Sequence, residues 1–246
     1  MRESDERNVH ESWSYSSGLE RRCLRSSPQL LPSNVVVRTC PGTWNGGAEI
    51  LPSEEGAVAT AVDKRRNEFA VGRACARAAL SELGVPPCPI PSGLHREPLW
   101  PPAVVGSITH CPRFCAAAVA IRASYHSIGI DAVIDEALPP GLLAYIAVDE
   151  EQSWLTGAPG DIHWDRLLFS AKESIFKAWF PLTRAWLGFQ DAMVTFSAND
   201  HAFWARLSRP LPHTCGGTRE LRGRFMLADG LIFTAALVKS RIQTTP

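Results

Sequence analysis

The sequence lacks an excess of charge of either sign. Its 246 residues carry 25 Lys and Arg against 25 Asp and Glu, so the formal net charge is +0 at pH 7. A protein that binds nucleic acid over a broad surface is usually strongly basic, and the composition argues against that class. Lysine is scarce: it occurs only at positions 64, 172, 177 and 239, so each lysine stands out against an arginine-rich background.

Long hydrophobic runs are also missing. The longest strongly apolar run, Phe114 to Ile121, has eight residues, whereas a membrane-spanning helix needs about 20. Residues 1–27 are rich in Ser and in charges of both signs, without the apolar stretch of a secretory signal. We therefore expect a disordered tail over residues 1–27, a cytosolic location and no contact with a membrane.

Several motifs that are typical of known metal sites and catalytic sites are absent. The seven cysteines form no Cys-x-x-Cys pair, and Cys111 and Cys115 beside His110 have no second ligand pair for zinc, so we expect reduced thiols. The Gly-x-Ser-x-Gly spacing of a nucleophile elbow is missing at Ser107. No Gly-x-x-x-x-Gly-Lys-Ser/Thr loop occurs, which excludes a P-loop NTPase.

The secondary-structure signals that are present mix helix and strand. Ser53, followed by two acids and by apolar residues at helical spacing, predicts a first helix that ends before Gly84. A second clear helix is predicted from Trp164 to about Phe180. Because regular βαβ alternation is missing, we predict an α+β fold. The other expected elements are a proline-rich loop over 86–102, a β-turn-β or strand-helix unit over 104–121, a strand over 127–133, a helix-loop region over 139–161, and strands over 192–196, 202–207, 222–227 and 231–239, with a hairpin turn at Asp229-Gly230.

Asp131 is the first candidate functional residue. It follows the apolar segment Ile128-Gly129-Ile130, which is typical of a buried strand. The end of a strand holds a catalytic or metal-binding acid rigidly. A turn aspartate or a helix cap is the alternative interpretation.

A second candidate group lies on the helix predicted from Trp164. Glu173 and Lys177 are four residues apart, so they project side by side from a face other than the apolar one. They could form an ordinary surface ion pair that contributes about 0.2–0.5 kcal/mol. Lys172 adds a third charge, and large aromatic residues flank all three, which favours the mouth of a site or an interface.

Arginines form the third candidate group, on the first predicted helix. Arg66, Arg73 and Arg77 fall close to one line, with Arg65 beside it. A guanidinium stripe suits phosphate, because arginine donates in a planar fork. The alternative is a solvated face on which Glu68 is the local partner. In a neutral chain, a local stripe favours a small phosphorylated ligand over a polymer.

The fourth candidate is the segment Gly106-Ser107-Ile108-Thr109-His110. A glycine, two hydroxyls and a histidine after Val104-Val105 predict a strand that ends in a polar, ligand-binding turn. A structural role for His110 is the alternative.

In their order and spacing these segments resemble the Sfp/EntD-type 4′-phosphopantetheinyl transferases, most closely the actinobacterial enzymes. The resemblance runs from about residue 50 to 196 and continues through Leu221-Arg222-Gly223-Arg224. A Gly-Ile-Asp segment followed about 40 residues later by Lys-Glu-Ser-x-x-Lys is specific to this family. The matching segments are Arg65-Arg66-Asn67-Glu68-Phe69 with Arg73, Arg96-Glu97-Pro98-Leu99-Trp100-Pro101, Gly106 to His110, Gly129-Ile130-Asp131, and Phe169-Ser170-Ala171-Lys172-Glu173 with Lys177.

The resemblance implies an activity and a fold. It implies transfer of the 4′-phosphopantetheine arm of coenzyme A to a serine of an acyl or peptidyl carrier protein, with release of adenosine 3′,5′-bisphosphate. It implies two pseudo-twofold-related α/β halves, over 28–125 and 126–246, with coenzyme A in the cleft between them. A monomer is expected, and the apolar residues of Leu142 to Trp154 are expected either to contact a carrier helix or to pack in the core.

The resemblance also implies roles for individual residues. Asp131 and Glu173 would hold Mg²⁺, with Mn²⁺ as the alternative, and Glu173 would also take the serine proton. Lys172 and Lys177 would bind the pyrophosphate, and Lys177 would stabilise charge on the leaving phosphate. The nucleotide phosphates would be held by His110, Thr109, Ser107, Arg65, Arg73 and Arg96.

One position departs from the family pattern. Bacterial members usually carry an acid two residues after the aspartate, and this chain has Val133 there. Some members lack this acid and use a water molecule instead, which is our expectation here. Two rival hypotheses remain: a non-catalytic coenzyme A-binding or carrier-binding protein with a degenerate metal site, and a nucleic-acid binder that uses the arginine stripe, against which the neutral charge counts.

Overall fold

The computed structural model describes residues 30–41, 47–160 and 162–240, and the tail predicted over residues 1–27 lies outside these ranges. Helices and antiparallel strands are mixed along the chain, which confirms the predicted α+β class. The elements in chain order are β1 (Val36–Pro41), η1 (Glu55–Ala57), α2 (Asp63–Glu82), β2 (Val104–Cys111), β3 (Phe114–Ile121), β4 (Tyr125–Ile134), α3 (Leu143–Ile146), α4 (Asp149–Leu155), α5 (Trp164–Thr183), η2 (Phe189–Asp191), β5 (Ala192–Ser197), β6 (Ala202–Leu207), η3 (His213–Cys215), β7 (Glu220–Ala228) and β8 (Leu231–Lys239).

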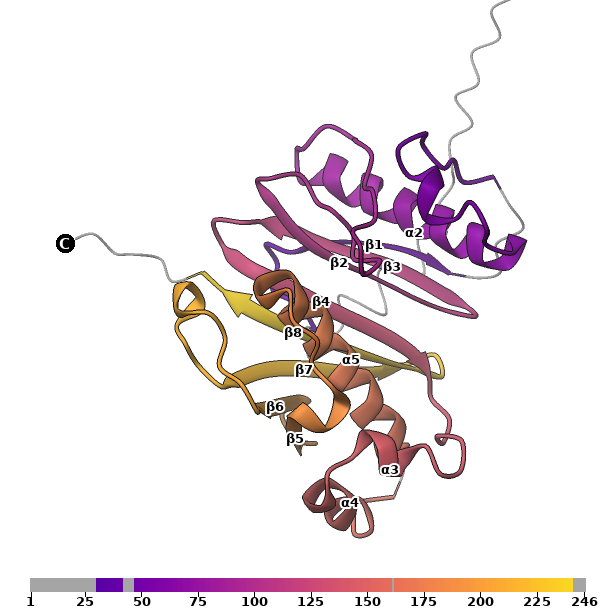
Figure 1. Cartoon of the computed structure of the whole chain (residues 1–246). Coiled ribbons are helices and arrows are strands. Elements are labelled where there is room, and N and C mark those ends of the chain that lie inside the picture. Colours follow the sequence, from indigo (N-terminus) through magenta and orange to yellow (C-terminus); the bar gives the residue numbers. More distant parts are fainter. Residues whose placement is uncertain (1–29, 42–46, 161, 241–246) are drawn as a thin grey trace, which may run out of the picture.

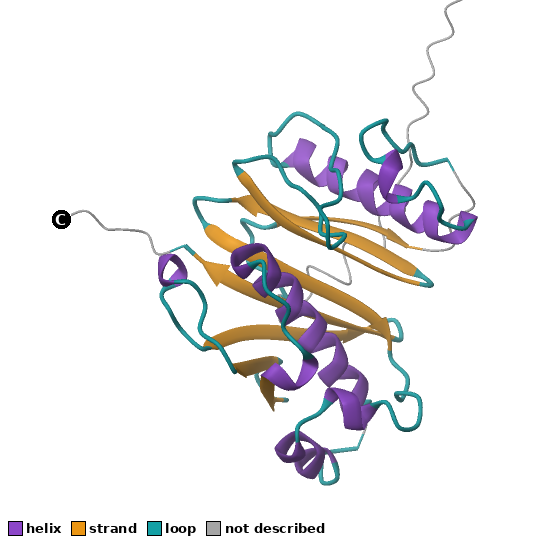
Figure 2. Ribbon diagram, viewed as in Figure 1, coloured by secondary structure: helices purple, strands orange, loops and turns teal. Residues whose placement is uncertain are grey.

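Two antiparallel sheets pack against each other, and one long helix covers the outer face of each (Figures 1 and 2). The first sheet has the strand order β1-β3-β2 and carries α2, while the second has the order β4-β8-β7-β6-β5 and carries α5. The chain passes from the first sheet to the second in the turn between Ile121 and Tyr125. No helix in the described part of the chain is long and apolar enough to span a bilayer.

The segment 104–121 forms a β-turn-β unit, since β2 and β3 pair from Val104↔Ile121 to Cys111↔Phe114. Strand β3 is almost entirely apolar because it is covered on both faces. Cys115, Ala117 and Val119 face α2, whereas Phe114, Ala116 and Ala118 pack against the second sheet. Small side chains on a doubly buried strand let both layers approach closely.

The helix predicted to begin at Ser53 begins ten residues later, at Asp63, and the earlier prediction is wrong. Glu54 was expected in the first turn of this helix, but it lies outside α2 and its carboxylate is fully buried. It accepts hydrogen bonds from the backbone N–H groups of Leu51 (3.0 Å) and Ile90 (2.8 Å) and from Arg77 (3.0 Å). A buried carboxylate needs such partners, and they hold residues 51–58 in turns and a short 3-10 helix.

Helix α5 lies directly on β4, and Gly129 makes this close approach possible. A Cβ atom at position 129 would collide with the backbone of Ser174 and Ala178. The apolar face of α5 includes Leu167, Leu168 and Ile175, each at most 1% exposed, and full burial of such a side chain contributes about 1.5–3 kcal/mol. Packing at this distance brings the charged face of α5 beside Asp131.

The remaining strand predictions are confirmed. β5, β6, β7 and β8 cover the four expected segments, and β7 and β8 join in a hairpin around Asp229-Gly230, where Ala228 pairs with Leu231. The loop over 86–102 contains no helix or strand apart from one bridge, Ser92↔Pro98.

Candidate functional site

Asp131 lies within β4, and its carboxylate sits between β2 and α5. Its Oδ1 accepts hydrogen bonds from Lys177 Nζ at 2.7 Å and from Thr109 Oγ1 at 3.2 Å. Its Oδ2 accepts a hydrogen bond from Ser170 Oγ at 2.9 Å. Asp131 as a whole residue is 7% exposed, so a buried strand position is confirmed over the turn interpretation.

Glu173 is half-buried on α5 and lines the same pocket as Asp131. In the described part of the chain its carboxylate makes no hydrogen bond or ion pair. Burial raises its pKa above the usual range, the charge of Lys177 lowers it, and the charge of Asp131 raises it further. The surface-pair interpretation does not hold, because the ammonium of Lys177 pairs with Asp131 across the boundary between β4 and α5.

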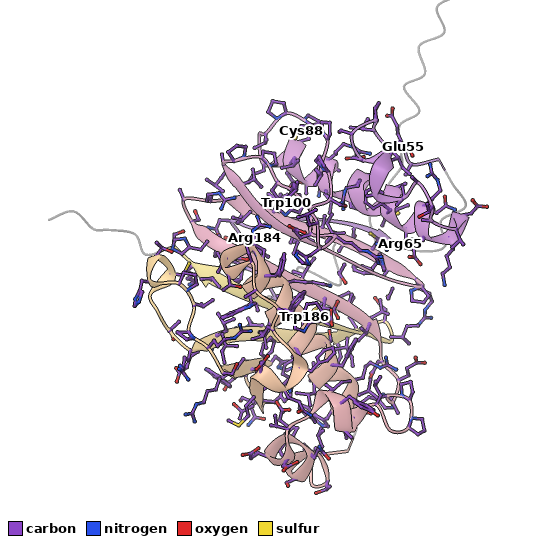
Figure 3. All side chains as sticks on the ribbon, in the orientation of Figure 1. Glu55, Arg65, Cys88, Trp100, Arg184 and Trp186 are labelled. Carbon is purple, nitrogen blue, oxygen red and sulfur yellow. The ribbon has the colours of Figure 1, made fainter. Side chains whose placement is uncertain are left out.

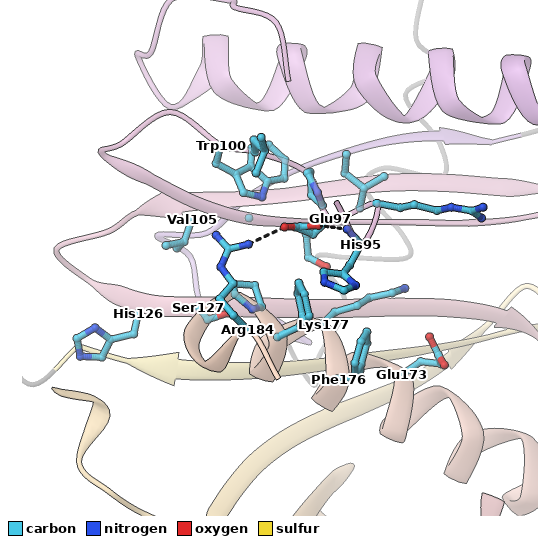
Figure 4. Close-up of a pocket in the computed structure, with 18 of the residues that line it drawn as sticks. His95, Glu97, Trp100, Val105, His126, Ser127, Glu173, Phe176, Lys177 and Arg184 are labelled. Atoms are coloured by element: carbon cyan, nitrogen blue, oxygen red, sulfur yellow. Dashed lines mark hydrogen bonds and ion pairs between the residues drawn. The ribbon is translucent and has the colours of Figure 1, made fainter. Parts of the chain in front are cut away.

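Three pockets adjoin one another: two lie where the first layer meets the second, and the third lies within the first layer. The acid pocket, about 640 Å³, contains Asp131 and Glu173 together with Arg65, His110 and Lys177. The central pocket, about 380 Å³, lies between residues 95–100, β2, the start of β4 and the C-terminal half of α5 (Figure 4). The arginine pocket, about 650 Å³, lies between residues 53–62, α2 and residues 92–96.

Shared residues connect the three pockets. Glu173 and Lys177 line both the acid and the central pocket. Arg65 lines both the acid and the arginine pocket, and Arg96 lines both the arginine and the central pocket. Figure 3 labels Trp100 in the first layer and Arg184 in the second, and both residues line the central pocket. The arrangement suits one extended ligand with a polyanionic part and an apolar part.

His110 and Arg65 are brought together at the acid pocket. Arg65 Nη1 lies 2.6 Å from His110 Nε2, and Glu68 lies 3.7 Å from the same ring nitrogen. Burial lowers the pKa of His110, while the charge of Glu68 opposes this change. Because a guanidinium group can only donate, His110 Nε2 accepts this hydrogen bond in the form of the ring that carries no proton on Nε2.

The arginine stripe is not a free anion-binding face. Arg66 pairs with Glu55 at 3.0 Å, and Arg77 pairs with Glu54 at 3.0 Å. Arg73 is 5% exposed and donates to the carbonyl of Ile90 at 2.6 Å, and burial lowers its pKa to about 10. These arginines hold neighbouring loops onto α2. Arg96 is exposed and Arg65 partly exposed, so both can reach a ligand.

Ser107 and Thr109 face β4 with hydroxyls that already have protein partners. Ser107 Oγ accepts a hydrogen bond from the N–H of Ile130 at 3.1 Å, and Thr109 Oγ1 accepts one from the N–H of Ala132 at 3.0 Å. Both residues are 4% exposed. They join β2 to β4 and thereby set the position of Asp131.

The structure does not bring Lys172 to this group, although sequence similarity implied a pyrophosphate ligand there. Its ammonium donates to Glu151 Oε2 at 2.6 Å and to the carbonyls of Ile146 and Phe189 at 2.8 and 2.9 Å. The Lys172 side chain is 1% exposed, and it lines none of the three pockets. All three donors of the ammonium are used inside the protein.

The segment 142–154 is divided between core and surface. Ile146 is 1% exposed and Leu143 packs against the core, which is the core-packing alternative for these two residues. Tyr145 is 77% exposed and Trp154 is 41% exposed. Leu142 is exposed as well, so these three apolar side chains of the segment are accessible to a partner.

The donor set at the acid pocket fits a hard divalent cation. Mg²⁺ prefers oxygen ligands and usually takes only one or two carboxylates, together with water and substrate phosphate. Asp131 and Glu173 offer two carboxylates, and the Glu173 carboxylate has no protein partner in the described ranges. The described residues contain no cluster of three or more His, Cys, Asp or Glu side chains that could hold a metal. The site therefore suits a metal that completes its coordination with substrate and water.

Sequence reasoning missed Ser170, Glu151 and Glu97 as members of this site and its surroundings. Ser170 and Glu97 belong to segments that carry the family resemblance, but nothing in the sequence signalled their partners. Glu151 follows two exposed acids, and its burial against Lys172 has no local sequence signal.

Comparisons with known proteins give consistent results. Residues 53–120 match the model of the 4′-phosphopantetheinyl transferase N-terminal domain, and residues 127–219 match that of the 4′-phosphopantetheinyl transferase superfamily. The 4′-phosphopantetheinyl transferase Svp of Streptomyces mobaraensis is 48% identical over 194 residues, covering 77% of this chain and 78% of the relative. The transferase Npt of Nocardia iowensis is 46% identical, covering 75% and 87%, and PptT of Mycobacterium tuberculosis is 45% identical, covering 78% and 87%.

Proposed function

This chain belongs to the 4′-phosphopantetheinyl transferase superfamily, and we propose that Asp131 and Glu173 hold a Mg²⁺ ion for the transfer of the 4′-phosphopantetheine arm of coenzyme A to a carrier-protein serine. The observation that carries this assignment is the convergence of two acids from β4 and α5 on one pocket, beside Lys177. The reaction releases adenosine 3′,5′-bisphosphate. Bound Mg²⁺ would neutralise negative charge on the pyrophosphate.

Different residues of the chain have different roles in the proposed reaction. The Glu173 carboxylate, whose pKa is raised by burial, accepts the proton of the attacking serine hydroxyl. Lys177 donates hydrogen bonds to the pyrophosphate and stabilises charge on the leaving phosphate. Arg65, Arg96 and His110 bind the nucleotide phosphates, while Ser107, Thr109 and the buried Arg73 hold the surrounding backbone.

We assign the pantetheine arm to the central pocket. This pocket begins at Glu173 and Lys177 and is lined by apolar side chains, among them Trp100, Phe176 and Phe180. Ser127 lies in its wall, and the Ser127 hydroxyl is buried with no hydrogen-bond partner in the described ranges. An amide of the arm would satisfy that hydroxyl.

Incubation with coenzyme A, an apo carrier protein and Mg²⁺ tests the proposal. We expect the carrier mass to increase by one phosphopantetheine group, and chelation of divalent ions to prevent the increase. Coenzyme A binding without any mass gain would favour the non-catalytic alternative that Val133 suggested. We also propose that the protein acts in the cytoplasm as a monomer.

A further inference from the structure

The loop Ser92–Pro98, here the roof loop, is a closed turn that forms one wall of the central pocket. Ser92 and Pro98 form an isolated bridge, the N–H of Gly93 donates to the carbonyl of Glu97 at 2.8 Å, and the N–H of Arg96 donates to that of Gly93 at 3.0 Å. Arg73 Nη2 donates to Ser92 Oγ at 3.0 Å and ties the loop to α2. These bonds hold residues 92–98 together as one closed turn.

Two contacts fasten the roof loop to α5 on the other side of the pocket (Figure 4). Arg184 Nη1 lies 2.6 Å from Glu97 Oε1, and the ring of His95 packs edge-on against Phe180 with centroids 5.2 Å apart. The side chain of Glu97 is 14% exposed, whereas that of Arg184 is 60% exposed. So exposed an ion pair is weak and is screened by salt, so it can open and close readily.

The ion pair lies far from Glu173 along the central pocket. Glu173 and Arg184 are eleven positions apart, which is about 16 Å along a helix that rises about 1.5 Å per residue. If the phosphates lie at Glu173 and Lys177, the arm runs toward Arg184. The thiol of the coenzyme, and any acyl group attached to it, then lies beneath the roof loop.

We infer that the Glu97–Arg184 ion pair is a latch that determines the size of the group accepted on the thiol of coenzyme A. This inference rests on the proposed function and on the assignment of the arm to the central pocket. With the latch closed, the pocket accommodates the free thiol. A long acyl thioester requires the roof loop to lift away from α5, so the latch selects coenzyme A over its long-chain acyl thioesters.

Gly93 offers a way to disturb the latch without removing either charge. A Cβ atom at position 93 would collide with the Glu97 carboxylate, which is the movable end of a flexible side chain. Gly93→Ala should therefore displace the Glu97 carboxylate from Arg184 without removing any charged residue from the loop.

The experiment compares coenzyme A, acetyl-coenzyme A and octanoyl-coenzyme A as donors to one apo carrier protein, with kcat/KM measured for each. All three donors carry identical phosphates, so an effect of a variant on phosphate binding cancels when kcat/KM for one donor is divided by kcat/KM for another. The unaltered protein should prefer coenzyme A. Glu97→Gln, Arg184→Gln and Gly93→Ala should each raise the ratio of octanoyl-coenzyme A to coenzyme A about tenfold. Glu82→Gln is the matched control. It removes the ion pair between Glu82 on α2 and Arg38 on β1, neither of which lines any of the three pockets, and it should leave the ratio unchanged.

Two further measurements protect the test against misfolded variants. The double variant Glu97→Arg with Arg184→Glu should restore the preference of the unaltered protein. Raising the salt from about 0.05 to about 0.5 M should shift the ratio of the unaltered protein toward the octanoyl donor. If the unaltered protein transfers the arm from coenzyme A, but neither salt nor the folded variants change the ratio, the latch is overturned. If it transfers from none of the donors, the proposed function fails instead.

Discussion

The ammonium of Lys177 lies 2.7 Å from Oδ1 of Asp131, and both residues line the pocket that contains Glu173. The carboxylate proposed to hold a metal is thus already paired with the lysine proposed to bind the pyrophosphate. A cation bound by Asp131 and Glu173 would compete with this ammonium, and a neighbouring phosphate would offer Lys177 a new partner. Metal and coenzyme binding are therefore expected to support each other.

Removal of either acid should abolish transfer. For Asp131→Asn and Glu173→Gln we expect transfer to fall by about 100-fold or more, because charge neutralisation by a metal is worth several kcal/mol. Glu136→Gln is the control, since Glu136 lines the same pocket but is exposed and paired with Arg166. Initial rates of carrier modification and melting temperatures check the prediction. Substantial turnover by either acid variant, with the fold intact, would remove the proposed metal site.

A carboxylate introduced at position 133 should strengthen metal binding. Val133 lies two residues after Asp131 on the same face of β4 and lines the acid pocket. Val133→Glu should lower the Mg²⁺ concentration that gives half-maximal transfer by several-fold, whereas Val133→Gln, of similar size but uncharged, should not. Metal titrations of the initial rate measure this difference. Loss of activity in Val133→Glu would show instead that a bound water molecule is needed there.

The buried pair Lys172–Glu151 should matter for stability more than for coenzyme binding. Glu151→Gln leaves the ammonium buried without a counter-charge, and breaking a buried ion pair in this way costs about 3–5 kcal/mol. Lys172→Met should also destabilise the fold, since Glu151 would lose its cationic partner. Urea unfolding measures the loss, and the KM for coenzyme A should change little in protein that remains folded. A normal unfolding midpoint with a raised KM would restore the pyrophosphate role that sequence similarity implied for Lys172.

His110 should make stability depend on pH. Its folded-state pKa lies below the usual value of about 6.5, mainly because of burial. Between the folded and the unfolded pKa the unfolded chain binds more protons, so stability rises with pH across this window. The contribution of His110 to the free energy of unfolding is complete above about pH 6.5, and it is lost as the pH falls through the folded-state pKa. Denaturant midpoints between about pH 5 and 7.5 should show this slope, and His110→Gln should reduce it. An unchanged slope in His110→Gln would assign the pH dependence to other groups.

The family was accessible from sequence because it rests on short, ordered motifs, and the same motifs contain the two acids proposed to hold the metal. Asp131 follows a hydrophobic strand, and Glu173 lies on a strongly amphipathic helix, and both patterns are local. The start of α2 was not predictable in the same way. Ser53-Glu54-Glu55 has the composition of a helix N-terminus, but a tertiary ion pair between Glu54 and Arg77 overrides that preference.

Partner choice among charged residues was the main source of error. On an isolated helix Lys177 would pair with Glu173 one turn away, and Arg66, Arg73 and Arg77 would share one exposed face. In the folded chain these side chains instead meet Asp131, Glu55, Ile90 and Glu54, which lie far away in sequence. Lys172 and Lys177 differ in fate for the same reason, since one side of α5 faces Glu151 and the other faces β4.

The sequence alone determined the order of the motifs, the helical periodicity of α5 and the two opposite directions of successive side chains in β4. Side-chain direction within a helix or strand follows from the repeat of that element. The packing of the two layers decides the rest, because its contacts link residues that are distant in sequence. It decides which charges neutralise one another, which lysine remains accessible in a pocket, and how the roof loop contacts Arg184. Local preferences carry no information about those distances, so only the tertiary structure decides them.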